Sequence, residues 1–134
     1  MLKILPMLAA IAGITSVALD AFGAHGLKPY LDMNQLSLWE KAVHYQIYHT
    51  LAAWVCSIYL KREYSGWVYS AAICFFIGIV CFSGSLYLLA TRHLTGIPGV
   101  VLGPVTPIGG FFFIAGWVLV LVNAWKNYTS DTTV

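Results

Sequence analysis

Apolar residues gather in four long runs that short polar or glycine-rich segments separate. The runs cover residues 4–22, 38–60, 66–90 and 108–125. A hydrocarbon layer about 30 Å thick takes about 20 helical residues to cross, so each run is long enough to span it. The pattern predicts an all-α polytopic membrane protein, with a single domain over residues 1–134 in which four transmembrane helices form a compact bundle.

The composition agrees with a membrane protein and narrows its partners. Hydrophobic residues make up 60% of the chain and charged residues only 9%, whereas soluble domains carry about 25% charged residues. The net charge is +2 and the seven Lys and Arg residues are scattered, so no basic stripe is available to bind nucleic acid. We expect membrane lipid and further copies of the chain as partners, with a membrane-protein partner possible.

The connections between the runs differ in character. The short segment "KREYS" at 61–65 predicts an antiparallel helix hairpin. In contrast, "LTGIPGVVLGPVTPIGG" at 94–110 carries no charge. Such a segment is either a surface loop or a re-entrant segment, and we expect it to be held against the bundle.

Two helix starts can be predicted from local chemistry. Ser37 and Glu40 match an S-x-x-E capping box at the start of the second run. At the fourth run, Thr106 is expected to cap the helix, with Pro107 at the first helical position.

The first run has a second interpretation, and its flanks bear on orientation. Lys3 followed by Ser16-Val17-Ala18 resembles a signal peptide with its cleavage site, but the apolar run continues beyond that site, so we expect it to be retained. Of the seven Lys and Arg residues, four are predicted on one side of the membrane and three on the other. By the positive-inside rule this small excess favours both termini in the cytoplasm. One side receives Lys3, Lys61, Arg62 and Lys126, and the other receives Lys28, Lys41 and Arg92.

Small residues recur at helical spacing on two runs. Such faces let helix backbones approach closely in lipid. The positions are Ala9, Gly13, Ser16, Asp20 and Gly23 on the first run, and Ala71, Cys74, Gly78, Cys81 and Ser85 on the third. The three cysteines lie in apolar stretches without CxxC or zinc-like spacing, so we expect neither a disulfide framework nor a metal site.

Asp20 and Lys41 are charges at unfavourable helix ends. Asp20 lies near the C-terminal end of the first run and Lys41 near the N-terminal end of the second, where the helix dipole opposes each charge. Antiparallel packing would bring them to similar depth, so we predict an ion pair between them, with His25 close enough to share the acid.

A second group of polar residues lies on the second run. His49 shares a face with Tyr45 near mid-membrane, where an ionisable residue is a functional candidate; the alternative is a neutral histidine that hydrogen-bonds across helices. Glu40, His44 and Tyr48 share the neighbouring face. The candidate site comprises Asp20, His25, Lys41, Tyr45, His49, Ser83, Ser85 and Arg92, and its alternative is a headgroup-level polar belt.

Five short motifs in order resemble one family. They are "AFGAHGLK", "YQIYH", "FSGSLY", "TPIGG" and "AGW", and together they are similar to domain-of-unknown-function family 423, the UPF0382-type small membrane proteins, to which animal transmembrane protein 256 is related. The resemblance implies four membrane helices and a bacterial cytoplasmic (inner) membrane location, and it implies no activity. The matching positions are Gly23, His25, Gly26, Tyr45, Gln46, His49, Ser83, Gly84, Ser85, Tyr87, Thr106, Pro107, Gly109 and Gly110. The family pattern more often has glycine at position 20 and varies at position 44. This favours His25 and His49 over Asp20 and His44 as functional residues shared by the family.

Three functions are compatible with these observations. A small-solute, ion or proton-linked permeation or binding unit acting as a homo-oligomer would hold His49, Tyr45 and Ser83 or Ser85 in a water-accessible cavity. A structural or assembly protein would instead be a dry bundle that packs on a partner through its small-residue faces. An enzyme or haem carrier using His25 and His49 is the weakest hypothesis, because the sequence offers no paired carboxylates, Ser/His/Asp set or phosphate loop; we expect no enzyme activity, cofactor or metal.

Overall fold

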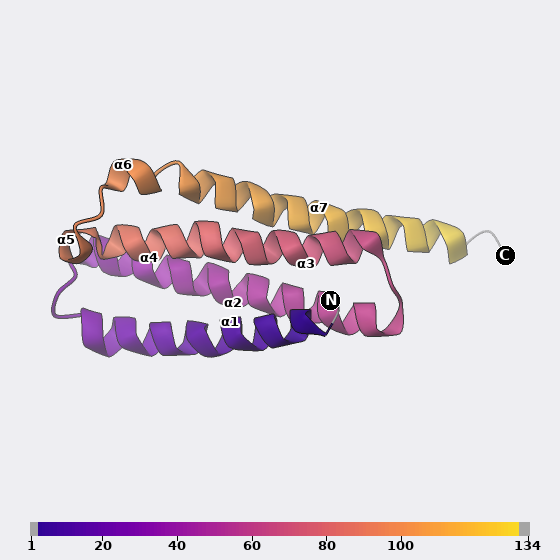
Figure 1. The fold of residues 1–134 in the computed structure, drawn as a ribbon, viewed down its shortest axis with the longest axis horizontal. Coiled ribbons are helices and arrows are strands. Elements are labelled where there is room, and N and C mark those ends of the chain that lie inside the picture. Colours follow the sequence, from indigo (N-terminus) through magenta and orange to yellow (C-terminus); the bar gives the residue numbers. More distant parts are fainter. Residues whose placement is uncertain (1–2, 132–134) are drawn as a thin grey trace.

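The fold consists of helical rods that lie roughly side by side (Figure 1). The computed structural model describes residues 3–131, and every regular element in that range is helical. The long elements are α1 (Ile4–Ala21) continued by the π-helix η1 (Phe22–Leu27), α2 (Met33–Arg62), a third rod made of α3 (Gly66–Gly78), the π-helix η2 (Ile79–Ser83) and α4 (Gly84–Ala90), and α7 (Val105–Asp131). The short α5 (Arg92–Thr95) and α6 (Gly99–Leu102) connect the last two rods.

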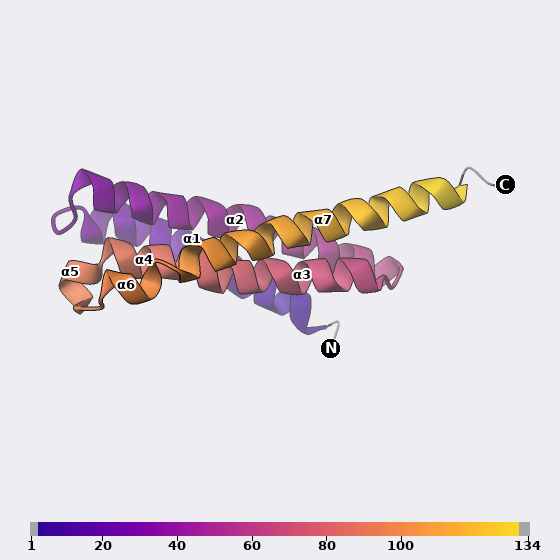
Figure 2. The ribbon, with the colours of Figure 1, turned by 90° about the horizontal axis from the view of Figure 1, so that it is seen from above.

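The rods are ordered so that α2 and the α3–α4 rod lie in the middle. α1 packs on α2, α2 packs on α3 and α4, and α7 packs on α3 and η2. Figures 1 and 2 show α1 and α7 as the outer rods, with α7 reaching beyond the others at its C-terminal end. One side of α2 is therefore left without a neighbouring rod of this chain.

Three helical stretches are long and apolar enough to cross a membrane. They are Ile4–Leu27, Gly66–Ala90 and Gly99–Tyr128. α2 is long enough but less apolar, because Gln46, two histidines and four charged residues interrupt its apolar residues. The all-α prediction is confirmed for the described residues, with three candidate spans among them in place of the four predicted.

The start of α2 differs from the prediction. The helix begins at Met33, and the N-cap is Asp32, whose carboxylate accepts from the Gln35 amide over 2.8 Å while the Gln35 side chain accepts from the Asp32 amide over 2.9 Å. The capping box predicted at Ser37 and Glu40 is therefore wrong. Those two residues lie inside the helix, where the preceding turn already satisfies the amides that a cap would serve.

The N-cap predicted at Thr106 is also wrong. α7 begins at Val105, so Thr106 is already helical, and its hydroxyl lies 2.7 Å from the Ser85 hydroxyl of α4. Before it, Gly96 takes a left-handed conformation (φ 71°) at the end of α5. α6 packs on α4 and α7, and its Leu102 is buried. This uncharged segment is thus held against the bundle through Leu102, while Val100 and Val101 are exposed.

The small-residue faces serve contacts within the chain. Gly109 of α7 lies against the backbone of Phe82, Gly78 lies beneath the ring of Phe113, and Gly13 faces Thr50. On the predicted face of the first run, Ala9, Ser16 and Gly23 are buried, but Asp20 is exposed. Close packing between this chain's own rods accounts for both faces.

Candidate functional site

A buried glutamine joins three rods at the centre of the structure. The Gln46 side-chain amide on α2 donates to the Ala12 carbonyl and to the Thr15 hydroxyl of α1, each over 2.9 Å. Its oxygen accepts from the Tyr87 hydroxyl of α4 over 2.9 Å. Thr15 lies in the middle of the candidate span Ile4–Leu27. Gln46 therefore lies near mid-depth of any membrane that α1 crosses.

His49, one turn further along α2, is buried and connects α2 to α7. Its Nδ1 lies 2.8 Å from the Tyr45 carbonyl, and the Trp117 indole donates to its Nε2 over 3.3 Å. Its ring stacks on Phe113 with 3.5 Å between centroids and 10° between planes. Because a carbonyl only accepts and an indole N–H only donates, these contacts fit a neutral imidazole that carries its proton on Nδ1. They match the alternative in which His49 is a structural histidine.

The predicted serines are buried, Ser83 at the end of η2 and Ser85 at the start of α4. The Ser85 hydroxyl donates to the Phe82 carbonyl over 2.9 Å and also contacts Thr106. Ser83 is fully buried, and its hydroxyl has no partner in the described structure. Tyr45 packs on the Phe82 ring and is partly exposed on the other side of α2. In this conformation neighbouring side chains close off His49, Ser83 and Ser85.

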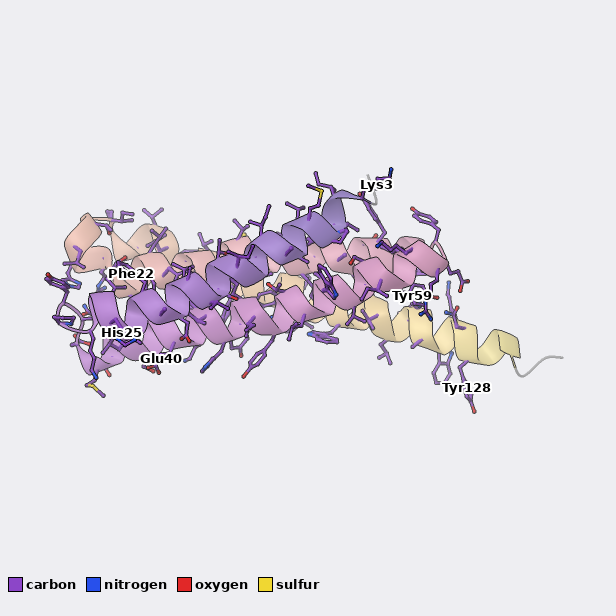
Figure 3. The ribbon with its side chains drawn as sticks, turned by 90° about the horizontal axis from the view of Figure 1, so that it is seen from below. Lys3, Phe22, His25, Glu40, Tyr59 and Tyr128 are labelled. Carbon is purple, nitrogen blue, oxygen red and sulfur yellow. The ribbon has the colours of Figure 1, made fainter. Side chains whose placement is uncertain are left out.

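The predicted charged residues gather at one end of the bundle without forming the predicted pair. Figure 3 shows His25 and Glu40 at the same end, with Lys3 and Tyr59 toward the other. Asp20, His25, Lys41 and Arg92 are all exposed, and no ion pair joins Asp20 to Lys41 within residues 3–131. The predicted ion pair is wrong. The two residues line separate hollows, because Glu40 and Lys41 are neighbours on α2 and point about 100° apart around its axis.

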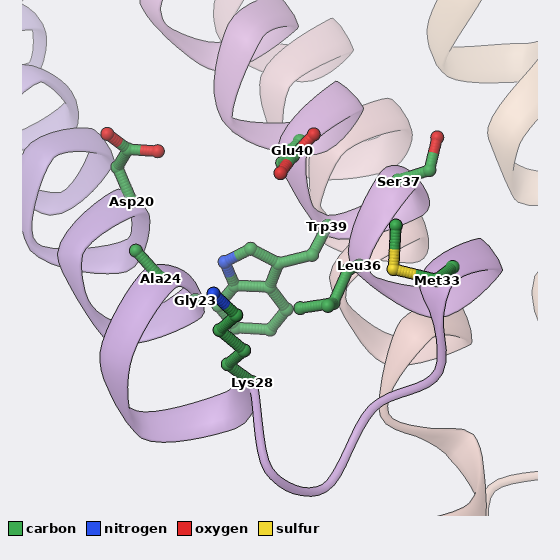
Figure 4. A pocket seen from close by; sticks show the side chains of 9 residues that line it. All are labelled: Asp20, Gly23, Ala24, Lys28, Met33, Leu36, Ser37, Trp39 and Glu40. Atoms are coloured by element: carbon green, nitrogen blue, oxygen red, sulfur yellow. The ribbon is translucent and has the colours of Figure 1, made fainter.

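Asp20 lines a pocket between η1 and the start of α2. The pocket has a volume of about 370 Å³ and is also lined by Lys28, Glu40 and Trp39. Figure 4 shows Asp20 and Glu40 on opposite walls with the Trp39 indole between them. The indole is fixed, because its N–H donates to the Leu19 carbonyl over 2.8 Å and its edge lies against Gly23.

One face of α2 carries a row of exposed polar side chains. We call it the α2 polar face; its residues are Ser37, Glu40, Lys41, His44, Tyr45 and Tyr48. All six are exposed, and they line a shallow groove of about 290 Å³. His44 stacks with Tyr48, with 6.1 Å between the ring centroids. The shared face was visible in the i, i+4 spacing of Glu40, His44 and Tyr48, but the depth of these residues was not.

The depth of the α2 polar face in the membrane follows from the contacts that Gln46 and His49, its neighbours on α2, make with α1 and α7. His44 and Tyr48 lie two residues on either side of Gln46, which is about 3 Å along the helix axis. On the α7 side, Phe113 contacts His49 and lies in the middle of the candidate span Gly99–Tyr128. Both neighbouring rods therefore put His44 and Tyr48 near mid-membrane, with their side chains exposed.

The described residues do not assemble a recognisable metal centre. No group of three or more His, Cys, Asp or Glu side chains within them could hold a metal ion.

Comparison with known proteins connects the chain to uncharacterised membrane proteins. A family model described as "Protein of unknown function (DUF423)" matches residues 19–110. A UPF0382 membrane protein of Staphylococcus haemolyticus is 38% identical over 130 residues, covering 93% of this chain and 98% of that protein. The UPF0382 inner membrane protein YgdD of Escherichia coli K12 is 41% identical over 116 residues, covering 87% of this chain and 85% of that protein. No solved structure matches the chain.

Proposed function

The chain belongs to the DUF423 family of membrane proteins of unknown function, and we propose that it acts as a permeation or binding unit for a small polar solute, ion or proton. In this proposal the protein is not an enzyme and works as a homo-oligomer. Its polar surface is the α2 polar face. The observation that carries the proposal is the exposure of His44 and Tyr48 near mid-membrane.

The proposal includes α2 as a fourth membrane span. α1 and the α3–α4 rod run in the same direction (Figure 1), so the chain must cross back between them. α2 is 30 residues long, about 45 Å at 1.5 Å per residue, and it packs on both. Four spans would leave both termini on one side, and the distribution of Lys and Arg favours the cytoplasmic side of a bacterial inner membrane.

An exposed imidazole near mid-membrane is costly unless a polar surface covers it. Ionisable residues within membrane spans face a protein interior or a water-filled cavity and pair with other polar groups. At comparable depth on the outer rods, Ile14 of α1 and Ile114 of α7 are 70% and 64% exposed, as suits contact with lipid. A second copy that covered the α2 polar face would therefore remove the cost of exposing these polar side chains to lipid.

A second copy has chemistry that complements this face. In a dimer with its two-fold axis along the membrane normal, the two α2 helices would meet through the same residues. Glu40 of one copy can then pair with Lys41 of its partner, and the imidazole of His44 can bond to the phenol of Tyr48 across the axis. Both pairings use opposite charges or complementary donors and acceptors.

The same face suggests a polar path that extends only part of the way through the membrane. Between Tyr48 and Lys61, the exposed residues of α2 are the apolar Leu51, Trp54, Val55 and Ile58. A polar solute could therefore reach the depth of His44 and Tyr48 between two copies, but its onward passage would need the apolar half to separate. We favour a binding vestibule with gated permeation over an open pore.

The alternative function is membrane-protein assembly, in which another protein covers the α2 polar face. The same exposed polar residues would favour it. The small-residue faces that this alternative was expected to use are, however, already packed between the rods of this chain.

Two measurements on the purified protein test the proposal. Native mass spectrometry from detergent should give a dimer or larger homo-oligomer, and proteoliposomes loaded with a pH-sensitive dye should conduct protons faster than protein-free vesicles. His44→Ala should reduce the flux, whereas His25→Ala, at the membrane edge, should not. A monomer with no flux would contradict the proposal, and a stoichiometric complex with another membrane protein would favour assembly.

A further inference from the structure

The pocket between η1 and the start of α2 lies where a membrane surface would be. Lys28, which directly follows the candidate span Ile4–Leu27, and Met33, the first residue of α2, both line the pocket, so it opens at the end of that span. The Trp39 indole, which bonds to Leu19 within the span, lies deeper in the pocket. The pocket volume of about 370 Å³ lies at the small end of the roughly 300–1,000 Å³ of ligand sites. A small group at the membrane surface would fit it.

The charges around this pocket are mixed and held apart. Asp20 and Glu40 provide carboxylates on opposite walls, and Lys28 provides an ammonium group that reaches toward Gly23 (Figure 4). No ion pair joins any two of these three side chains among residues 3–131. A ligand that carries both a cation and an anion would satisfy charges that the protein leaves separate.

We infer that this pocket binds a zwitterionic headgroup with a primary ammonium and a phosphate, the chemistry of phosphatidylethanolamine. The ammonium would lie between Asp20 and Glu40, and the phosphate would lie against Lys28. The apolar lining residues Met33 and Leu36 would face the two methylene groups of the ethanolamine. The pocket adjoins the groove lined by His44 and Tyr48 and shares Ser37 and Glu40 with it, whereas Asp20 and Lys28 line the pocket alone. The inference does not require the proposed permeation function, because it is tested at Asp20 and Lys28, which lie outside the groove.

The charges select between common headgroups. A primary ammonium has three N–H donors for two carboxylates, whereas the quaternary ammonium of phosphatidylcholine has none. Phosphatidylglycerol has a phosphate but no cation, so it would leave both carboxylates unpaired. The expected order of affinity is phosphatidylethanolamine, then phosphatidylcholine, then phosphatidylglycerol.

The experiment measures lipid retention on the full chain. Detergent-purified protein is mixed with equal amounts of dioleoyl phosphatidylethanolamine, phosphatidylcholine and phosphatidylglycerol, and the bound lipids are identified by native mass spectrometry. We expect preferential retention of phosphatidylethanolamine. Asp20→Asn and Lys28→Met should each weaken it by about tenfold or more, as expected for the loss of one charge-assisted hydrogen bond. These positions lie outside the α2 polar face, so loss of lipid here is distinguishable from loss of oligomer.

Matched variants and a soluble probe complete the test. Glu63→Gln and Lys61→Met change exposed charges at the other end of α2 and should leave retention unchanged. Binding of soluble O-phosphoethanolamine with the same dependence on Asp20 and Lys28 would support the site chemistry and would show that acyl chains are not required. Equal retention of the three lipids, preference for phosphatidylglycerol, or equal losses in the matched variants would overturn the inference.

Discussion

Trp117 of α7 donates its indole N–H to Nε2 of His49 on α2 across 3.3 Å, while Nδ1 of the same imidazole lies 2.8 Å from the Tyr45 carbonyl. Both ring nitrogens are thus used by the fold. His49 was a leading functional candidate from sequence, yet its contacts connect helices. The exposed polar residues of α2, one helical face away, are free to contact something outside the chain.

Replacing Trp117 should destabilise the chain through His49. Trp117→Phe keeps an aromatic ring but removes the N–H, which leaves the buried Nε2 without a donor. We expect a loss of about 1 kcal/mol in unfolding free energy, typical of hydrogen bonds between membrane helices, measured by thermal unfolding in detergent. Trp54→Phe, on the exposed side of α2, is the matched control. Equal losses in both variants would mean that the hydrogen bond contributes little.

The Gln46–Tyr87 bond should show strong coupling. Gln46→Leu leaves the Tyr87 hydroxyl without a partner, and we expect a loss of about 1–3 kcal/mol. Tyr87→Phe removes the orphaned group, so the double variant should lose less than the sum of the two single variants. A double-mutant cycle by thermal unfolding measures the coupling; additive losses would argue against a direct bond.

Substituting alanine at the adjacent residues Gly109 and Gly110 should have opposite effects on stability. A methyl group at Gly109 would overlap the backbone of Phe82, whereas at Gly110 the nearest atoms lie 3.7 Å away on the Phe82 ring. Gly109→Ala should force α7 away from η2 at a cost of about 1–3 kcal/mol. Gly110→Ala should be neutral or slightly stabilising, because alanine favours helix. Similar unfolding temperatures for the two variants would contradict the packing of α7 described above.

The start of α2 can be tested with two short polar residues. Asp32→Ala should cost about 1 kcal/mol and increase amide exchange in the first turn of α2, because Asp32 is the N-cap. Ser37→Ala should change stability by less than about 0.5 kcal/mol. If Ser37→Ala were the more damaging change, the helix would begin later than the structure has it.

The apolar runs were enough to predict the helical elements but not all their ends. The third run matches the Gly66–Ala90 rod, since its polar flanks at Lys61–Ser65 mark the turn clearly. The start of α2 was missed because two S/D-x-x-E/Q patterns follow one another, and only Asp32 and Gln35 form the box. Local pattern alone does not decide between them.

The site was harder to predict because it depends on helix rotation and depth. Asp20 and Lys41 do lie at the same end of the bundle, but one step of rotation around α2 directs Glu40, and not Lys41, toward the Asp20 pocket. The mid-membrane depth of His44 follows from the bonds of Gln46 to Ala12, Thr15 and Tyr87. These are long-range contacts that no spacing in the sequence encodes.

The central claim is that a second copy of the chain covers the α2 polar face, and cysteine cross-linking in membranes tests it most directly. In a background with Cys56, Cys74 and Cys81 replaced by alanine, single cysteines are introduced at His44 or Tyr48 and, as depth-matched controls, at Ile14 and Ile114. A disulfide needs Cα atoms about 4.4–6.8 Å apart, so mild oxidation should give cross-linked dimers for His44→Cys or Tyr48→Cys and none for Ile14→Cys or Ile114→Cys. Cross-links only at the isoleucine positions, or at none of the four, would contradict the account.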